Sequence, residues 1–287
     1  MKINICTISF RHSLVSFSEL VLLAKDLKVS GIELWYPHAV SLLNKYNMDI
    51  FNTLDELHID IPMISGYLNL LCENEAFKGE LSRLQKMITA AEKFKCKTIR
   101  IFAGNVCSRY FDNDMLDRCI KRIRIICDVL SKNDLFLAVE THPNTLADTL
   151  DSTIKLVEKT DKKNFKINYD VLHLWENGDD MIEAYKILKD SIINFHLKNI
   201  SERKYLPVFD PMNIYSPAGA RDGIILLKEG LIDYELFIKT LVEDNFNSSL
   251  SIEWFGKDPF SVLKEECNWL NKLNEKYSNK ESIGITV

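Results

Sequence analysis

The chain has 287 residues, 46% of them hydrophobic and 27% charged, which is the balance of a globular protein long enough for one large domain. Its formal charge of -5 excludes a general attraction to nucleic acid or to anionic membranes, although a local basic site for an anionic substrate stays open. No run of about 18 apolar residues occurs, so we expect no membrane span.

The first residues of the chain and its cysteines indicate a compartment. The opening segment, MKINICTISFRHS, has the pattern of a first β-strand, because it lacks the long apolar core and the cleavage site of a signal peptide. The seven cysteines form no CxxC pair, so we expect free thiols in a reducing environment instead of disulfides or a zinc ribbon. Both features predict a cytoplasmic protein.

Short β-branched runs alternate with longer amphipathic runs along the chain. We expect eight strands, at Ile3–Ser9, Gly31–Trp35, Ile61–Ser65, Thr98–Gly104, Phe136–Pro143, Phe165–Asp170, Ile193–Asn199 and Leu250–Gly256. Between them we expect helices at Ser18–Leu27, Phe77–Phe94, Met115–Leu130, Thr149–Glu158, Asp180–Leu188, Tyr234–Glu243 and Pro259–Glu275. Several of these helices follow Ser, Thr or Asp, which cap the free N–H groups of a first turn.

This alternation predicts an α/β fold, a (β/α)8 TIM barrel with a parallel sheet. A doubly wound open sheet is the second option, but its glycine-rich first turn is absent from residues 6–13. We expect residues 1–276 to form a single domain, followed by a polar tail at 277–287. Residues 201–230 are a long insertion after the seventh strand, on the face where barrels keep their functional loops.

Four strands break the apolar pattern of a buried sheet near their C-terminal ends. The breaks place Glu140, Asp170, His196 and Glu253 on successive strands, and side chains two apart share a face. A single carboxylate at a strand end usually caps a helix or pairs at the surface. Four polar breaks at one end predict a divalent ion that offsets the repulsion of three carboxylates. Three oxygen donors and one imidazole favour Mn²⁺ or Mg²⁺.

Two further charged residues interrupt earlier strands. Arg100 either pairs with a barrel carboxylate or clamps an anionic group of a substrate, since guanidinium matches carboxylate and phosphate geometry. Glu33 either supports the metal ligands from behind or pairs with Arg100. The sequence leaves both alternatives open.

The motifs around these residues resemble the xylose-isomerase-like family of sugar phosphate isomerases and epimerases. They are GIELW at 31–35, VETHPNT at 139–145, the DxxH of Asp170 and His173, NFHLKN at 194–199 and SIEWFG at 251–256. Together with CTISFRH at 6–12 and IRIFAG at 99–104, the ETHPNTLADTL segment at 140–150 and the tyrosine-containing insertion look most like the 3-dehydroshikimate dehydratases of petrobactin siderophore biosynthesis. The tail after about residue 275 carries no resemblance.

The resemblance implies a lyase that makes 3,4-dihydroxybenzoate for a catecholate siderophore. It implies that Glu140, Asp170, His196 and Glu253 hold one divalent ion, Mn²⁺ first, with Mg²⁺ or Co²⁺ as alternatives. It implies that His142, His173, Lys198 and Arg100 line the substrate site, with Tyr67 and Tyr215 as further contacts. We assign His142 as the first candidate base and His173 as the second. Lys198 would stabilise an enolate or assist the leaving group, and Arg100 would hold the substrate carboxylate.

Three other functions compete with this interpretation. A sugar or sugar-phosphate isomerase or epimerase would use the same metal site, so the ligands do not discriminate. An apurinic-site endonuclease would need several metals and a DNA-binding surface, which six histidines and the negative charge disfavour. A non-catalytic barrel that binds a metabolite would leave the metal ligands and neighbouring base without a use. The expected partner is the small molecule 3-dehydroshikimate, with neither nucleic acid nor membrane, and a homodimer is left open.

Overall fold

The computed structural model describes residues 1–43, 49–247 and 249–281. Eight parallel strands close into a barrel in the order β1-β10-β7-β6-β5-β4-β3-β2. They are β1 (Lys2–Cys6), β2 (Gly31–Trp35), β3 (Ile64–Ser65), β4 (Thr98–Ile101), β5 (Phe136–Glu140), β6 (Phe165–Asp170), β7 (Ile192–Leu197) and β10 (Ser249–Ile252). The predicted fold class is therefore confirmed.

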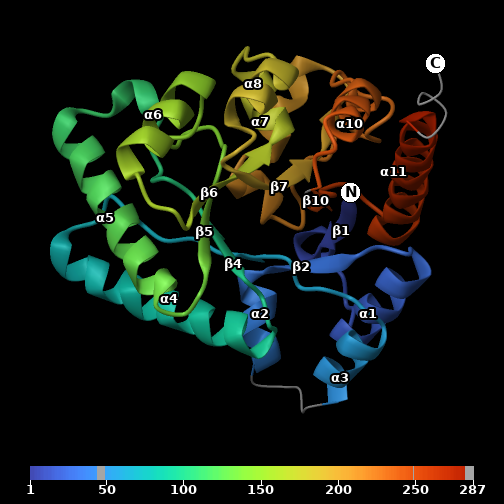
Figure 1. Cartoon of the computed structure of the whole chain (residues 1–287), viewed down its shortest axis with the longest axis horizontal. Coiled ribbons are helices and arrows are strands. Elements are labelled where there is room, and N and C mark those ends of the chain that lie inside the picture. Colours follow the sequence, from blue (N-terminus) through green and yellow to red (C-terminus); the bar gives the residue numbers. More distant parts are fainter. Residues whose placement is uncertain (44–48, 248, 282–287) are drawn as a thin grey trace.

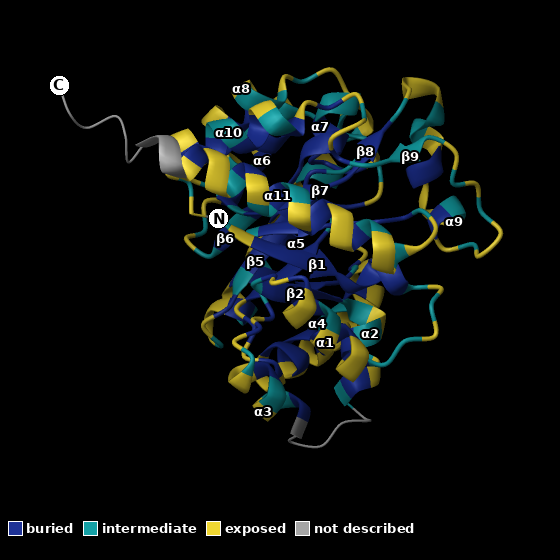
Figure 2. Ribbon diagram, turned by 90° about the vertical axis from the view of Figure 1, so that its right-hand side faces the viewer, coloured by how far each residue is buried: buried dark blue, intermediate teal, exposed yellow. Residues whose placement is uncertain are grey.

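Helices surround the barrel, and their outer faces are exposed while the strands are buried (Figures 1 and 2). The helices found at the positions expected from the sequence are α1 (Phe17–Asp26), α4 (Asn74–Lys93), α5 (Asn113–Ser131), α6 (Leu150–Thr160), α8 (Met181–Leu188), α10 (Tyr234–Glu243) and α11 (Pro259–Glu281). The expected caps are present: Ser16 and Glu19 form a capping box on α1, and the side chain of Asp112 accepts from the N–H of Met115. Within the described residues, no helix has the length and apolar character to cross a membrane.

The sequence patterns missed several short elements. Helices α2 (Tyr36–Leu43) and α3 (Asp49–Glu56) lie between β2 and β3, and α7 (Val171–Glu176) follows β6 directly. No Ser, Thr or Asp stands directly before α2 to mark its start in the sequence. Strand β1 ends at Cys6 because the chain turns into a 3-10 helix, η1 (Thr7–Phe10).

The expected insertion lies at the C-terminal end of the barrel and has structure of its own. It contains the 3-10 helix η3 (Arg203–Phe209), the short helix α9 (Pro211–Ile214) and strand β9 (Ile224–Ile225), which pairs antiparallel with β8 (Asn199–Ile200) just before the insertion. Figure 2 shows β9 and α9 on the side of the barrel away from the N-terminus. A further 3-10 helix, η2 (Ser108–Tyr110), follows β4.

The expected tail at 277–287 falls partly within the described residues. Helix α11 continues to Glu281, and Tyr277 packs against the core with its hydroxyl donating to Glu235 Oε1 at 2.7 Å. Residues 282–287 lie outside the described part of the chain. The helical segment therefore extends past the boundary that the change to polar composition suggested.

Alternation along the strands separates two environments. Apolar residues such as Ile99, Val139 and Phe195 fill the layer between the strands and the helices. Polar residues two apart on the opposite face, including Asn168 and Asp170 of β6, meet inside the barrel through the hydrogen bonds and ion pairs described below. The barrel interior is therefore polar toward its C-terminal end, and this polarity positions the candidate site.

Candidate active site

Four side chains from neighbouring strands meet at the C-terminal end of the barrel. Glu140 ends β5, Asp170 ends β6, His196 lies in β7 and Glu253 follows β10. All four are buried, and one potential ligand atom from each lies within 4.8 Å of the others. The strand register produces this meeting, because Asp170 is paired with His196 across β6 and β7. The structure thus brings together the four residues that the sequence pattern predicted to converge.

The contacts of the His196 imidazole indicate whether this cluster suits a metal ion. Its Nδ1 lies 3.2 Å from Glu140 Oε2 and 3.4 Å from Glu253 Oε2, but neither contact is aligned as a hydrogen bond. A buried nitrogen without a partner costs free energy. A divalent cation bound among the carboxylates would accept the nitrogen lone pair. The donor set of three carboxylates and one imidazole therefore fits one hard or borderline ion.

Two basic side chains lie against the same carboxylates. Lys198 contacts Asp170 Oδ2 and lies 2.8 Å from Glu253 Oε2, and Arg100 Nε lies 2.9 Å from Glu140 Oε2. Burial opposes the ionisation of Glu140, but the charges of Arg100 and His196 outweigh it and lower the pKa of this carboxyl. At Asp170 burial dominates over His173 and Lys198, so the pKa is raised. The cluster therefore already contains positive charge.

His142 and His173 lie beside each other at the edge of this cluster, with ring centroids 4.4 Å apart. The Nδ1 of His142 lies 2.8 Å from the carbonyl oxygen of Pro143, which can only accept, so this nitrogen carries the hydrogen. The Nδ1 of His173 lies 2.7 Å from Glu176 Oε1. Burial lowers the pKa of His142 to about 3 and that of His173 to about 4. Both rings are thus neutral near pH 7, and the ring of His142 has its lone pair on Nε2.

Glu176 is a site residue that our sequence interpretation missed. Asp170 caps helix α7, where its Oδ1 accepts from the N–H of His173 at 3.3 Å. Three-residue spacing puts Asp170, His173 and Glu176 on one side of this helix. The signal was present as D-x-x-H-x-x-E at 170–176, but our interpretation stopped at the histidine. Burial raises the pKa of Glu176 to about 7.

Aromatic rings form a wall beside the histidines. The hydroxyl of Tyr215 donates to the hydroxyl of Tyr67 at 2.9 Å, and Trp35 Nε1 donates to the same oxygen at 3.2 Å. The rings of Trp35 and Tyr215 are stacked at 5.8 Å with an interplanar angle of 13°. Phe102 continues the wall, 4.4 Å from the His142 ring. Tyr67 and Tyr215, expected separately as substrate contacts, therefore lie in contact with each other.

Arg100 lies under this wall, only 2% exposed, with its guanidinium carbon 5.3 Å from the Tyr67 ring and 4.9 Å from the Phe102 ring. The pairing with Glu140 corresponds to one of the two roles that the sequence left open for Arg100. Within the described residues its Nη1 has no hydrogen-bond partner. This nitrogen is a free donor at the base of the aromatic wall, so the role as an anion clamp also stays available.

Phe209 and Phe255 are further residues that the sequence interpretation did not single out. Their rings lie 5.8 Å and 5.5 Å from the ammonium of Lys198. Phe255 follows Glu253 in the SIEWFG motif, whereas Phe209 belongs to the insertion. Nothing in the local pattern tied Phe209 to the site, because its position depends on how the insertion folds back over β7.

A ladder of amides supports the metal-ligand cluster from inside the barrel. Asn168 Nδ2 donates to Glu140 Oε2 at 3.0 Å, and Asn194 Nδ2 donates to Asn168 Oδ1 at 2.8 Å. Ser251 Oγ donates to Asn194 Oδ1 at 3.3 Å. Each of these residues stands two positions before a residue of the cluster, so the two-residue period of a strand could have identified them. The ladder fixes one carboxylate oxygen of Glu140.

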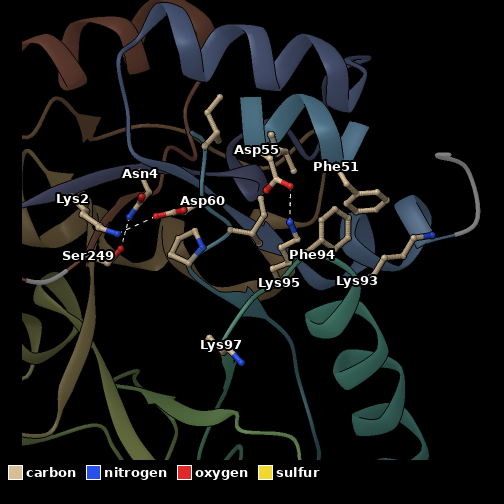
Figure 3. Close-up of a pocket in the computed structure, with 14 residues that line it drawn as sticks. Lys2, Asn4, Phe51, Asp55, Asp60, Lys93, Phe94, Lys95, Lys97 and Ser249 are labelled. Atoms are coloured by element: carbon tan, nitrogen blue, oxygen red, sulfur yellow. Dashed lines mark hydrogen bonds and ion pairs between the residues drawn. The ribbon is translucent and has the colours of Figure 1, made fainter. Parts of the chain in front are cut away.

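A separate depression of about 370 Å³ opens at the opposite end of the barrel (Figure 3). Four of its six charged side chains form ion pairs: Lys2 Nζ lies 3.0 Å from Asp60 Oδ2, and Lys95 Nζ lies 2.5 Å from Asp55 Oδ2. These pairs are exposed, and exposed pairs contribute little free energy. The amino end of a barrel is ordinarily devoted to stability. We therefore place the candidate site at the C-terminal end.

The strand order of the barrel, together with the carboxylates and histidines at its C-terminal end, indicates the class of protein to which the chain belongs. A family model described as xylose isomerase-like TIM barrel matches residues 21–273. The chain belongs to this family.

Within the family, one relative is similar over almost its whole length. The chain is 38% identical over 277 residues to a protein of Bacillus anthracis named 3-dehydroshikimate dehydratase, covering 96% of this chain and 98% of that protein. The crystal structure of the probable 3-DHS dehydratase AsbF, involved in petrobactin synthesis in Bacillus anthracis, superimposes with a TM-score of 0.91 and covers 94% of this chain and 99% of that one.

A solved structure of much lower sequence identity shows the same fold. The structure of an L-ribulose 3-epimerase superimposes with a TM-score of 0.77 at 15% identity, covering 100% of this chain and 99% of the epimerase. At this identity the similarity says nothing about the reaction. The epimerase therefore does not favour one chemistry over another.

Proposed function

We propose that this protein catalyses the metal-dependent dehydration of 3-dehydroshikimate to 3,4-dihydroxybenzoate. The observation that carries the proposal is the full-length similarity, at 38% identity, to the dehydratase of Bacillus anthracis. The geometry supports the chemistry, because two neutral histidines lie beside a cluster of metal-ligand type and a wall of aromatic rings borders both. Flat aromatic walls suit a six-membered ring that becomes planar during the reaction.

Glu140, Asp170, His196 and Glu253 would hold one divalent ion, with Mn²⁺ as the first candidate. The unpartnered Nδ1 of His196 and the three carboxylates around it support this assignment. When bound, such an ion would supply a positive charge that stabilises an enolate oxygen formed during proton removal. Asn168 would keep one oxygen of Glu140 oriented through its hydrogen bond.

The proton on C4 of the substrate is acidic, because this carbon neighbours the C3 ketone. His142 or His173 would take it, since both rings are held neutral and the hydrogen on Nδ1 of His142 leaves its Nε2 free to accept. The C5–O bond then breaks, a C4–C5 double bond forms and the hydroxyl leaves as water after gaining a proton. Loss of a C6 proton and protonation of the C3 oxygen complete the aromatic ring. The carboxylate partner of His173 favours this ring as the base.

Arg100, Tyr67 and Tyr215 would bind the substrate. The free Nη1 of Arg100 would donate to the substrate carboxylate, and the two tyrosine hydroxyls provide further hydrogen bonds at the same wall. Lys198 lies between the carboxylate cluster and two phenylalanine rings, where its ammonium would stabilise the enolate or protonate the leaving hydroxyl.

We propose a cytoplasmic role in siderophore synthesis, which the same relative and the cysteines support. A catechol product would feed a catecholate siderophore, and all seven cysteines are free in the structure, which suits the cytoplasm. The described helices, the net charge and the small site give no support to membrane or nucleic-acid partners. We keep a homodimer as an option only.

One assay tests the proposed reaction. The protein is loaded with Mn²⁺, mixed with 3-dehydroshikimate and followed by the ultraviolet absorbance of 3,4-dihydroxybenzoate, beside an EDTA-treated sample and a Glu253→Gln variant. We expect product only in the loaded wild type. Well-folded, loaded protein without product would reject the dehydratase, and ketohexoses and their phosphates would then test the isomerase alternative.

A further inference from the structure

Glu33 is a buried carboxylate that contributes no atom to the ligand cluster. It lies in the middle of β2, beside β1, and none of its surface is exposed. Its two oxygens lie 3.0 Å and 3.1 Å from Nε2 of His196. The hydroxyl of Ser65 on β3 donates to Glu33 Oε1. Strands β2 and β3 thus orient a carboxylate toward the far side of an imidazole that faces the cluster.

This contact decides which nitrogen of His196 carries the hydrogen. An ionised carboxylate only accepts hydrogen bonds, so the Nε2 between its two oxygens must be the N–H group. In a neutral ring the lone pair then belongs to Nδ1. Nδ1 is the atom that lies among Glu140 and Glu253 without a hydrogen-bond partner. A metal-binding imidazole is neutral, so in that state the ring presents its lone pair to the cluster and its hydrogen to Glu33.

We propose that Glu33 is the positioning residue of the metal centre, which fixes the His196 tautomer that can bind a cation. This inference rests on the metal site proposed above. Carboxylates behind metal-binding histidines also raise the basicity of the ring, because they stabilise positive charge on it. Without Glu33, the hydrogen could move to Nδ1, and this nitrogen would then have no lone pair for a cation.

Pairing with Arg100 is the other role that the sequence allowed for Glu33. The contact of Arg100 in the structure is with Glu140, at 2.9 Å, while the close contacts of Glu33 are with His196 and Ser65. Glu33 therefore acts on the imidazole. In a merely structural role, Glu33 would only fill space in the barrel and accept the hydrogen bond from Ser65. The experiment must separate this structural role from the positioning of His196.

The test compares two variants that replace a buried carboxylate by an amide of the same shape. Glu33→Gln retains volume, but its amide group can turn and donate to Nε2, which releases the hydrogen to Nδ1. Glu266→Gln is the matched control, because Glu266 in α11 is similarly buried and bonds the N–H of Leu227 at 2.7 Å, with no contact to the cluster. Metal-free protein is titrated with Mn²⁺, and free Mn²⁺ is followed by electron paramagnetic resonance.

We expect Glu33→Gln to weaken Mn²⁺ binding by ~10–100-fold, the usual effect of losing such a partner, while Glu266→Gln binds as the wild type does. A second readout is the ¹⁵N signals of the histidine rings in protein loaded with diamagnetic Mg²⁺, where the variant should lose the signature of one Nε2–H tautomer. If Glu33→Gln does not fold, Ser65→Ala takes its place, with a smaller loss in the same direction.

The outcomes separate the two proposals. A wild type that binds no divalent ion overturns the metal site and this inference with it, whatever the enzymatic assay gives. In the other case the wild type binds Mn²⁺, and folded Glu33→Gln (or Ser65→Ala in its place) has the same Mn²⁺ affinity and the same ring signals. That result overturns the role of Glu33 alone. Since metal binding is measured without substrate, failure of the dehydratase assay leaves this result interpretable.

Discussion

The ammonium of Lys198 lies directly against Oδ2 of Asp170 inside the barrel, at the position where a carboxylate would serve a metal ion. The same nitrogen is 2.8 Å from Glu253 Oε2, so one lysine contacts two of the four candidate ligands. A lysine at this position offsets the negative charge of the cluster when no cation is bound. It also opposes the cation that the cluster would hold.

We expect Lys198→Met to separate these effects. Removal of the ammonium leaves buried carboxylates uncompensated, which should destabilise the metal-free protein by about 3 kcal/mol or more. The same removal should tighten Mn²⁺ binding, on the order of tenfold, because a like charge next to the cation is lost. Thermal unfolding with and without Mn²⁺ measures both. A variant with weaker Mn²⁺ binding than the wild type would contradict this interpretation and make Lys198 part of the support for the ligands.

Glu176→Gln should distinguish the two candidate bases. The amide oxygen can still accept from Nδ1 of His173 but carries no charge to stabilise a protonated ring. If His173 is the base, we expect turnover to fall by roughly 10²-fold or more and His173→Ala to lose roughly 10²–10⁴-fold, both with unchanged metal content. A deuterium at C4 of the substrate should then slow the Glu176→Gln variant more than the wild type.

His142→Ala is the companion measurement. Our sequence interpretation made His142 the first candidate base, and its Nδ1 is held only by the carbonyl of Pro143. A loss of roughly 10²–10⁴-fold in His142→Ala, beside a normal rate in Glu176→Gln, would restore His142 to that role. Equal losses in both would assign the two histidines to two separate proton transfers.

Tyr215→Phe should affect substrate binding without affecting the metal. The change removes the hydroxyl that donates to Tyr67 at 2.9 Å and retains the ring stacked on Trp35. One lost hydrogen bond is worth about 0.5–1.5 kcal/mol, so we expect KM to rise roughly 2–10-fold. Steady-state kinetics and Mn²⁺ titration check the two parts. An unchanged KM would remove the Tyr215 hydroxyl from the substrate site.

Glu266 should make the stability of the fold depend on pH. Burial raises the pKa of this carboxyl to about 7 from its ordinary 4.5, against the opposing hydrogen bond from Leu227. Between these values the folded state keeps a proton that the unfolded state releases. The contribution of Glu266 to the free energy of unfolding is therefore fully present below about pH 4.5. It is lost as pH rises through 7, by up to about 3 kcal/mol. Denaturant unfolding of wild type and Glu266→Gln at about pH 5 and about pH 8, which span most of this window, should show a smaller pH effect in the variant.

Local patterns in the chain were enough to predict the barrel and the members of its cluster. Eight β-branched runs separated by amphipathic runs leave few folds other than a closed parallel sheet, and Tyr234–Glu243 is a helix with the same bounds as expected. The two-residue period of a strand is enough to put Glu140 and His142 on one face, and their side chains do lie together. Such features depend on periodicity over a few neighbouring residues, which can be recognised in the chain directly.

Contacts between strands that are distant in sequence depend instead on closure of the sheet. Glu33 meets His196 across the barrel, 163 positions apart, and no local pattern could pair them. The dual contacts of Lys198 and the position of Phe209 beside it also depend on this closure and on how the insertion folds back. The orientation of the His196 imidazole follows from Glu33, which closure brings into reach. Local periodicity predicts which face a residue occupies, whereas barrel closure decides which groups share that space and therefore which atoms are free to react.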